Sequence, residues 1–266
     1  MTQKPEIWCI GGRQGSGKTT LAQQLAADGS YTHIDRDTEL RRLLSLYNEK
    51  AFLRVLDLSQ YRSVFEWKKA VDQFAGRLRA DIRHYIRLLH ESKNSNLLGI
   101  THVLENILRR DNEHVLQMFS HSQTISATYS IFADLKTLEQ AIQVAKRTGQ
   151  PVLFNNVAFS TQEHRETTVR LLQDHGIDPR LIIVRSTAQR LVAVARKRLR
   201  DPNRILGQAN ISSLGQFDPY IPSEGWDRVI VVDNIGDIRD IAQTVRSKIA
   251  LNTPDTLTDP VSFLVN

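Results

Sequence analysis

Residues 12–19 restrict the fold of this chain more than any other part of its sequence. They read Gly12-Arg13-Gln14-Gly15-Ser16-Gly17-Lys18-Thr19 and satisfy the pattern G-x-x-x-x-G-K-[ST] in full. An apolar segment (residues 7–10) precedes them, and a segment with helical periodicity (residues 18–27) follows. Backbone N–H groups can surround a polyphosphate only where the chain bends tightly, which glycine permits, and a helix start adds the positive end of its dipole. The pattern therefore predicts a phosphate-binding loop between a strand and a helix.

This loop predicts ATP and Mg²⁺ as cofactors. Lys18 is expected to reach the β- and γ-phosphates, and the Thr19 hydroxyl is expected to bind Mg²⁺. The residues expected to bind the nucleotide are Gly12, Arg13, Gln14, Gly15, Ser16, Gly17, Lys18, Thr19 and Thr20. The chain lacks a guanine-reading Thr-Lys-x-Asp motif at a strand end, which argues against a GTPase. It also lacks an apolar strand ending in Asp-Glu, which argues against a motor ATPase.

Strand and helix signals alternate along both ends of the chain. Short apolar runs predict five strands, at residues 7–10, 31–35, 152–155, 181–185 and 228–232. Helical periodicity predicts the segments between them, at residues 18–27, 162–175, 187–200 and 238–251. Such alternation is typical of a mostly parallel sheet with helices on both faces. We therefore expect an α/β fold of the P-loop kinase type, with about five strands.

A helical insertion of roughly a hundred residues separates the second and third strands. Its clearest part is residues 64–91, where apolar side chains step by three and four along one face. Further helices are expected at residues 97–109, 112–119 and 135–148. The expected division is a kinase core at residues 1–42 and 151–252, an insertion at 43–150 that could bind the acceptor, and a surface tail at 253–266. The basic residues on 64–91 fit either a solvated helix face or a track for a phosphate backbone.

Amino-acid composition indicates the general kind of partner but does not identify one. The chain has 266 residues with 35 Lys and Arg against 29 Asp and Glu, a formal charge of +6, which favours anionic partners. Cys9 is its one cysteine, so an intramolecular disulfide is excluded. No apolar run is long enough for a transmembrane helix and no secretory signal pattern is present, so we expect a cytoplasmic protein without a membrane partner. Oligomeric state is left open.

The segment 31–41 carries a family resemblance together with the phosphate loop. Ile34-Asp35-Arg36-Asp37-Thr38 resembles the end of the second strand in polynucleotide-kinase-like and zeta-toxin-like P-loop kinases. The resemblance implies that Asp37 activates an acceptor hydroxyl, with Asp35 and Arg41 on the substrate side. It covers roughly residues 6–42 and 151–250 and leaves 43–150 unmatched.

The second half of the chain extends the resemblance. Residues 152–156, 162–165 and 181–185 resemble the family's third strand, following helix and fourth strand, which implies that Asn156 and Arg165 lie on the substrate side. Arg196 and Arg200 are spaced i, i+4 and match the pair that the family uses as a lid over the phosphates. A helix N-cap role for Asp37 and a solvated face for Arg196 and Arg200 are the structural alternatives.

One departure concerns the end of the third strand, which is usually acidic in these kinases. Asn155 and Asn156 stand there, and an amide cannot act as a base or neutralise Mg²⁺. Either Asp35 supplies the acidic role or turnover is weakened. The sequence thus favours an ATP-dependent kinase acting on a hydroxyl, with the 5′-hydroxyl of RNA or DNA as first acceptor. A nucleotide sugar or nucleoside is the second, and a nucleotide-binding regulatory or effector module with weak catalysis is the remaining alternative.

Overall fold

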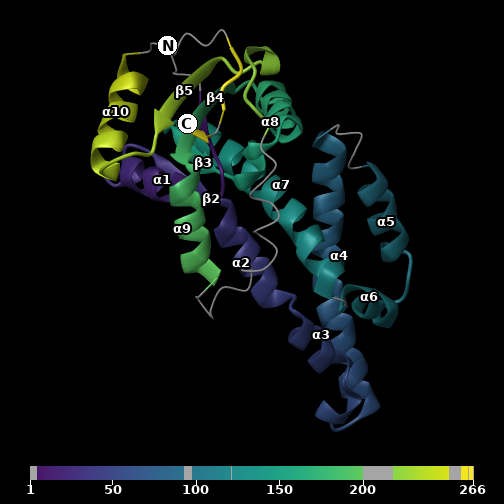
Figure 1. Ribbon diagram of the computed structural model, residues 1–266. Helices are drawn as coiled ribbons and strands as arrows, with labels where there is room; N and C mark the ends of the chain where they lie inside the picture. Colours follow the sequence, from purple (N-terminus) through teal and green to yellow (C-terminus); the bar gives the residue numbers. More distant parts are fainter. Residues whose placement is uncertain are drawn as a thin grey trace. The chain divides into compact units, whose positions relative to one another are not determined.

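The computed structural model describes residues 5–92, 98–120, 122–199, 218–251, 259–262 and 264–265 (Figure 1). The chain divides into two compact units. The first unit combines Met1–Asp35 with Glu139–Asn266, and the second is Arg36–Leu138. Each unit has its own hydrophobic interior and is described below by itself.

The first unit is built on a parallel sheet. Its main strands are β1 (Glu6–Gly11), β2 (Thr32–Asp35), β3 (Val152–Asn155), β4 (Asp178–Thr187) and β5 (Arg228–Asp233). They are hydrogen-bonded in the order β2-β3-β1-β4-β5, and each neighbouring pair is parallel. The expected α/β class, with a parallel sheet of five main strands and helices around it, is confirmed. All five predicted strands are present, and β4 extends further in both directions than the apolar run alone indicates.

Helices cover both faces of this sheet. One face packs against α1 (Lys18–Ala26) and α10 (Ile238–Ala250), whose buried residues join Trp8, Ile10 and Ile230 in one cluster. The other face carries α8 (Gln162–Asp174) and the short helix η3 (Val157–Ser160), and α9 (Ala188–Leu199) follows β4. Figure 1 shows α1 and α10 together on one side of the strands and α8 on the other. Strands covered on both faces must be apolar throughout, which explains the short unbroken apolar runs in the sequence.

The C-terminal segment contributes a strand that the sequence does not predict. β6 (Leu264–Val265) pairs in parallel with Ser186 and Thr187 of β4, beyond the point where β1 ends opposite Ile183. Val261 also bridges Tyr220, just before the short helix η5 (Pro222–Glu224). Two-residue strands have no detectable periodicity, which is why the sequence alone indicates a surface tail for this segment.

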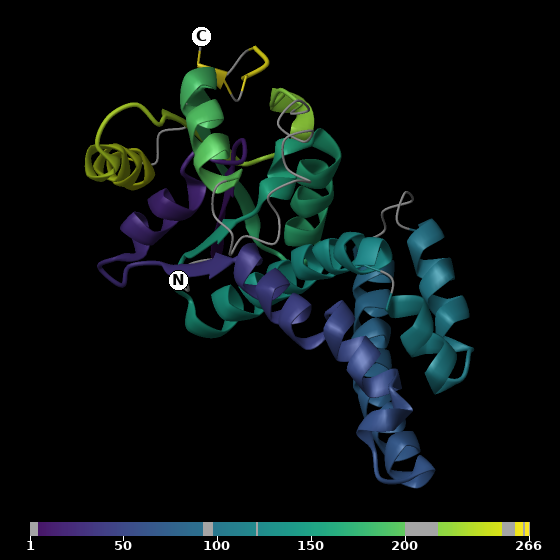
Figure 2. The same ribbon diagram turned by 60° about the horizontal axis from the view of Figure 1, so that its bottom comes forward.

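The second unit is entirely helical within its described residues. Its elements are α2 (Arg36–Leu46), α3 (Glu49–Leu56), η1 (Leu58–Gln60), α4 (Val64–Ser92), α5 (Leu98–Leu108), α6 (Asn112–Phe119) and the first part of α7 (Ser122–Thr148). Both α5 and α6 pack along α4 (Figure 2). Two features differ from what the sequence predicts. Helix α7 begins thirteen residues before the expected residue 135, and α2 follows β2 with no intervening loop.

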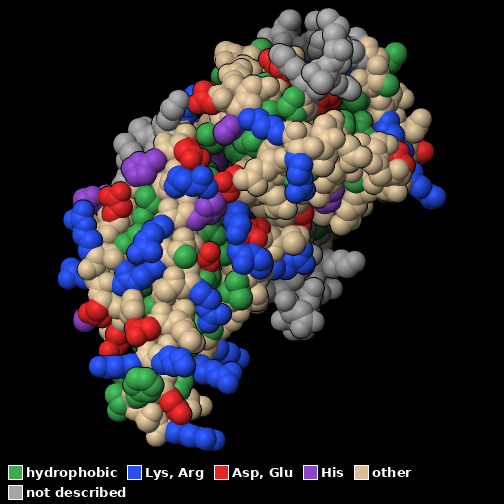
Figure 3. All heavy atoms as spheres, turned by 180° about the vertical axis from the view of Figure 1, so that it is seen from behind, with side chains coloured by type: hydrophobic (Ala, Val, Ile, Leu, Met, Phe, Trp, Pro, Cys, Tyr) green, Lys and Arg blue, Asp and Glu red, His purple; other side chains and the backbone are tan. Residues whose placement is uncertain are grey.

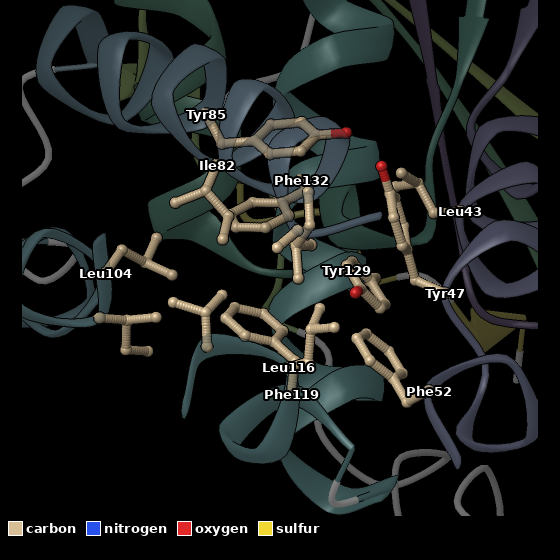
Figure 4. Close-up of a cluster of buried hydrophobic side chains, with 14 of the residues drawn as sticks. Leu43, Tyr47, Phe52, Ile82, Tyr85, Leu104, Leu116, Phe119, Tyr129 and Phe132 are labelled. Atoms are coloured by element: carbon tan, nitrogen blue, oxygen red, sulfur yellow. The ribbon is translucent and has the colours of Figure 1, made fainter. Parts of the chain in front are cut away.

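An aromatic cluster forms the interior of the second unit (Figure 4). The rings of Tyr85 and Phe132 stack with centroids 3.7 Å apart, and Tyr47 stacks on Tyr129 at 5.7 Å. The apolar stripe of α4 supplies Val71, Phe74, Leu78, Ile82 and Tyr85 to this interior. These side chains are therefore core residues, which is what the helical spacing of the stripe predicts.

Candidate functional site

The phosphate-loop pattern folds into a turn that only glycine can complete. β1 ends at Gly11 and α1 begins at Lys18, as the pattern requires. Gly12, Gly15 and Gly17 have φ angles of 149°, 87° and 95°, and a Cβ on Gly12 would lie 2.5 Å from the Val184 carbonyl oxygen. Both the backbone conformation and the lack of space exclude other residues at Gly12. The turn is closed by Ser16, whose N–H donates to the Arg13 carbonyl over 3.0 Å.

Lys18 holds its ammonium group against this loop. Its Nζ donates to the carbonyl oxygens of Gly12 and Arg13, each over 2.8 Å, and the residue is 8% exposed. The positive charge is thus fixed at the N-terminus of α1, where the helix dipole also favours an anion. Burial lowers the pKa of the neighbouring Arg13 from its ordinary value. Gln14 is half-buried, whereas Thr20 is exposed.

Asn234, which the sequence analysis missed, closes the loop from a second strand. It follows β5 directly, its N–H donates to the Arg185 carbonyl over 2.9 Å, and its side-chain amide donates to the Ser16 carbonyl. Asn234 Oδ1 and Ser16 Oγ are both buried without a hydrogen-bond partner within the described part of the chain. Unsatisfied buried polar atoms beside a loop of this shape fit a polar ligand. The sequence signal was the position alone, one residue past the carboxyl end of a parallel strand.

Thr19, Asp35 and Asn155 meet at the carboxyl ends of β2 and β3. Asn155 Nδ2 donates to Asp35 Oδ1 over 2.9 Å and to Thr19 Oγ1 over 3.2 Å. Its Oδ1 lies 2.5 Å from His33 Nε2. Because the amide nitrogen faces two oxygens, the amide oxygen must face His33, and His33 Nε2 is therefore the donor. Strand register produces this meeting, since Asp35 pairs with Asn155 and Asn155 pairs with Ile10 just before the loop.

Oxygens of these side chains would fit a magnesium ion. The Thr19 hydroxyl and the Asp35 carboxylate are oxygen ligands of the kind Mg²⁺ takes, one or two from protein and the rest from phosphates and water. No cluster of three His, Cys, Asp or Glu that could hold a metal ion occurs among the described residues. Asp35 is the carboxylate of this set, and Asn155 occupies the position where an acid was expected.

Asp37 and its neighbours belong to the second unit. Asp37 lies in the first turn of α2 with a side chain 62% exposed, and its carboxylate is 3.4 Å from the Arg36 guanidinium. Arg36 itself is buried, with Nε 2.8 Å from Asp134 Oδ1 and a further contact to Ser130. Arg41 donates to the Asp37 carbonyl over 3.1 Å. Chain connectivity alone keeps the Asp37 Cα within about 7 Å of the Asp35 Cα.

Two residues expected on the substrate side are buried in the first unit. Arg165 is 0% exposed; its Nε and one terminal nitrogen each lie 2.6 Å from a Glu224 oxygen, and it also donates to the Phe159, Asp218 and Pro219 carbonyls. These contacts hold its guanidinium in the interior, and the substrate-side role that the resemblance implies stays a prediction. Asn156 is 4% exposed.

The expected lid pair is described only in part. Arg196 lies on α9 with an exposed side chain, whereas Arg200 falls outside the described residues. Exposure at Arg196 agrees with either a lid or a solvated helix face. No helix in the described part of the chain is both long and apolar enough to cross a membrane.

Comparisons with known proteins find only distant structural similarity. No family model matches the chain, and no curated protein matches it significantly. Among solved structures, a protein from Chloroflexus aurantiacus assigned provisionally as a kinase superposes with a TM-score of 0.49 at 16% identity, covering 95% of this chain and 100% of that one. Shikimate kinase from Acinetobacter baumannii gives 0.45 at 15%, covering 95% and 96%. At this level of similarity neither structure identifies a reaction or an acceptor for this chain.

Proposed function

We propose that this protein is an ATP-dependent phosphotransferase that acts on a hydroxyl group. The observation that carries the proposal is the line of contacts Thr19–Asn155–Asp35 beside the loop lysine, which ends two residues before Asp37. A phosphate loop alone supports many nucleotide-driven activities. A loop followed by a carboxylate on the next strand and a second carboxylate two residues later supports transfer to an acceptor.

Each group has a defined task in this reaction. ATP with Mg²⁺ supplies the transferable phosphoryl group and the divalent charge. Lys18 and the N–H groups of the loop would hold the phosphates, and the Thr19 hydroxyl and the Asp35 carboxylate would hold the magnesium ion. Asp37 accepts the proton of the acceptor hydroxyl, and the guanidinium of Arg196 stabilises negative charge on the transferred group. Asn155 holds Thr19 and Asp35 in a fixed orientation by donating to both.

Two acceptor classes follow from different observations. The resemblance of Arg36-Asp37 to polynucleotide kinases and the net basic charge favour a 5′-hydroxyl of RNA or DNA. The second unit carries 16 Lys and Arg against 12 Asp and Glu, which is +4 of the total +6. Arg36 itself is buried in an ion pair with Asp134, which weakens its part in the argument for a nucleic-acid acceptor. The small-molecule acceptor is therefore kept as the second class.

The test is product detection by mass spectrometry. The purified chain is incubated with ATP and Mg²⁺ and with three acceptor sets: 5′-hydroxyl RNA, 5′-hydroxyl DNA, and a metabolite extract. A phosphorylated product is expected from the wild type and from Asp240→Asn, an exposed aspartate in the first turn of α10 that serves as the matched control. Lys18→Ala and Asp37→Asn are expected to lower product formation at least about a hundredfold.

The outcome also separates the remaining alternative. ATP hydrolysis that does not depend on any acceptor, or nucleotide binding without turnover, would contradict the proposal and favour a regulatory nucleotide-binding module. Full activity of Asp37→Asn would remove Asp37 from the reaction.

A further inference from the structure

Four exposed apolar side chains gather at one end of the helical unit. Leu53 on α3, Leu58 on η1, and Val64 and Phe65 at the start of α4 are 55%, 48%, 56% and 79% exposed. The three elements follow one another in the chain and pack together. We call these four residues the apolar tip. Exposed apolar groups that occur together rather than singly mark an interaction surface.

Phe65 does not contribute to the buried stripe of α4. The stripe of α4 that enters the core continues through Trp67, Val71 and Phe74, and Phe65 is off that stripe. Its helical neighbours at i+3 and i+4 are Lys68 and Lys69, both exposed, so the ring stands on the charged face of the helix. Phe65 is the most exposed phenylalanine in the described part of the chain, at 79%, and two lysines are its neighbours one turn further along the helix.

The start of α4 is fixed without help from the apolar tip. Glu66 N–H donates to Ser63 Oγ over 3.1 Å, and Glu66 Oε2 accepts from the Arg62 N–H over 3.1 Å. This reciprocal arrangement is a variant of a capping box, which stabilises a helix start locally. The exposed apolar side chains therefore have no evident role in holding this part of the fold.

Five cations lie in the same stretch of chain as the apolar tip, and we call them the cationic ring. Lys50, Arg54, Arg62, Lys68 and Lys69 are all exposed, and none of their side chains makes an ion pair within the described part of the chain. Carboxylates in the same stretch are fewer, and two of the three serve local backbone turns: Asp57 accepts from Ser59, and Glu66 accepts from Arg62. Figure 3 shows hydrophobic side chains beside Lys and Arg side chains at this end of the unit.

We propose that the apolar tip and its cationic ring dock onto an anionic lipid surface. Apolar side chains, above all Phe and Leu, beside lysines and arginines are the composition that inserts shallowly into a charged membrane interface. Lysine is depleted in protein–protein interfaces, yet three of the five cations here are lysines. Single-stranded nucleic acid is bound by stacking on several aromatic rings, and three of the four tip residues are aliphatic.

This inference goes beyond the proposed phosphotransferase activity and does not depend on it. The sequence suggested no membrane partner because no segment can span a bilayer, whereas surface docking needs no spanning segment. A protein held at a membrane by this tip would meet acceptors that are concentrated there.

Vesicle co-sedimentation of the full chain tests the proposal. Vesicles of phosphatidylcholine alone are compared with vesicles that also contain phosphatidylserine, at low and high salt. The wild type is expected to pellet with the anionic vesicles, less so at high salt because the charges are screened. Phe65→Ser is expected to lower the partition coefficient about tenfold. The pair Lys68→Gln and Lys69→Gln is expected to lower it about fivefold for each charge removed.

Matched controls separate the tip from general surface effects. Val103→Ser removes from α5 an apolar side chain that is 55% exposed, as Leu53 is, and Arg83→Gln removes an exposed cation further along α4. Both are expected to bind as the wild type does. Phe65→Leu keeps an apolar side chain and should retain most of the binding. Circular dichroism melting verifies that each variant is folded.

Three results would overturn the proposal. One is the absence of wild-type binding to anionic vesicles at low salt. Another is binding that Phe65→Ser and the lysine pair leave unchanged. The third is a wild-type dimer in sedimentation velocity that Phe65→Ser dissociates, which would make the tip a contact between copies of the chain. Phosphorylation of a soluble acceptor is measured without vesicles, so its failure is distinguishable from failure of this proposal.

Discussion

The side-chain amide of Asn155 donates to the carboxylate of Asp35 over 2.9 Å at the carboxyl ends of two neighbouring strands. The same nitrogen also reaches the Thr19 hydroxyl. A carboxylate at position 155 would instead repel Asp35, since two adjacent carboxylates cannot both stay ionised without a cation between them. Asparagine at this position therefore holds Asp35 by a hydrogen bond instead of repelling it.

Asn155→Asp should make the stability of the protein depend strongly on magnesium. The substitution removes two N–H donors and adds a negative charge beside Asp35, so we expect a loss of about 2–4 kcal/mol in chelator. A divalent cation between the carboxylates should restore most of this loss. Thermal melting with EDTA and with Mg²⁺ measures both effects. Asn155→Ala is the control, because it loses the hydrogen bonds without adding charge; an equal recovery of this variant in Mg²⁺ would contradict the explanation.

Gly17→Ala should be destabilising mainly because of Asn234. A Cβ on Gly17 would lie 2.2 Å from Asn234 Nδ2, at a φ angle of 95°. Gly29 offers a matched control, because its φ angle is 78° and a Cβ there would have no heavy atom within 4 Å beyond its chain neighbours. Gly29→Ala should cost only the backbone strain, about 1–2 kcal/mol. Gly17→Ala should cost about 1–3 kcal/mol more, since it also breaks the bond from Asn234 to Ser16.

A double-mutant cycle isolates that contact. Asn234→Ala removes the amide that the new methyl group would strike. The loss of unfolding free energy in the Gly17→Ala/Asn234→Ala protein should therefore be smaller than the sum of the losses in the two single variants. Urea denaturation of the four proteins gives the coupling free energy. Strict additivity would mean that Asn234 is not what restricts Gly17.

The sequence predicted the features that depend on nearby residues. Strand runs, the stripe on α4 and the glycines of the loop are local patterns, and the structure agrees with each of them. Parallel topology followed from the alternation of elements. In the structure, Asp35 and Asn155 end neighbouring strands and contact Thr19 at the start of α1.

The side-chain contacts that the sequence did not predict join residues that are far apart in the chain. Arg165 meets Glu224, which is 59 positions away, and Arg36 meets Asp134 at a separation of 98. Asn234 reaches Ser16 across 218 positions. From the sequence alone, any arginine is a candidate ligand for phosphate or substrate, because a buried carboxylate that pairs with it cannot be identified.

Arg165→Met tests this distinction directly. Removing the guanidinium leaves Glu224 buried without its cation, although Ile221 N–H and Trp226 Nε1 still donate to it. We expect a loss of about 3–5 kcal/mol in unfolding free energy. If an acceptor is found, its KM should stay within about twofold of the wild type at a temperature where the variant is folded. A large KM change with little loss of stability would return Arg165 to the substrate side.

Acid should weaken the second unit through Glu39. Burial acts to raise the pKa of Glu39, but hydrogen bonds from Arg42 and the charges of Lys136 and Arg42 outweigh it, and the net pKa is lowered. Both carboxylate oxygens accept from Arg42, over 2.8 Å and 2.7 Å. Because the pKa is lower in the folded state, the contribution to stability is complete above the unfolded value of about 4.3 and is lost as pH falls through the folded value.

Glu39→Gln should therefore lower the free energy of unfolding by about 1 kcal/mol at pH 7 and by progressively less below pH ~4. Urea denaturation across this range, followed by circular dichroism, measures the difference between the two proteins. Arg42→Met should produce the same convergence, and the double variant should add little to either single change because the two residues share one interaction. A difference between wild type and Glu39→Gln that stays constant down to about pH 3 would show that packing, rather than the charged pair, accounts for the loss.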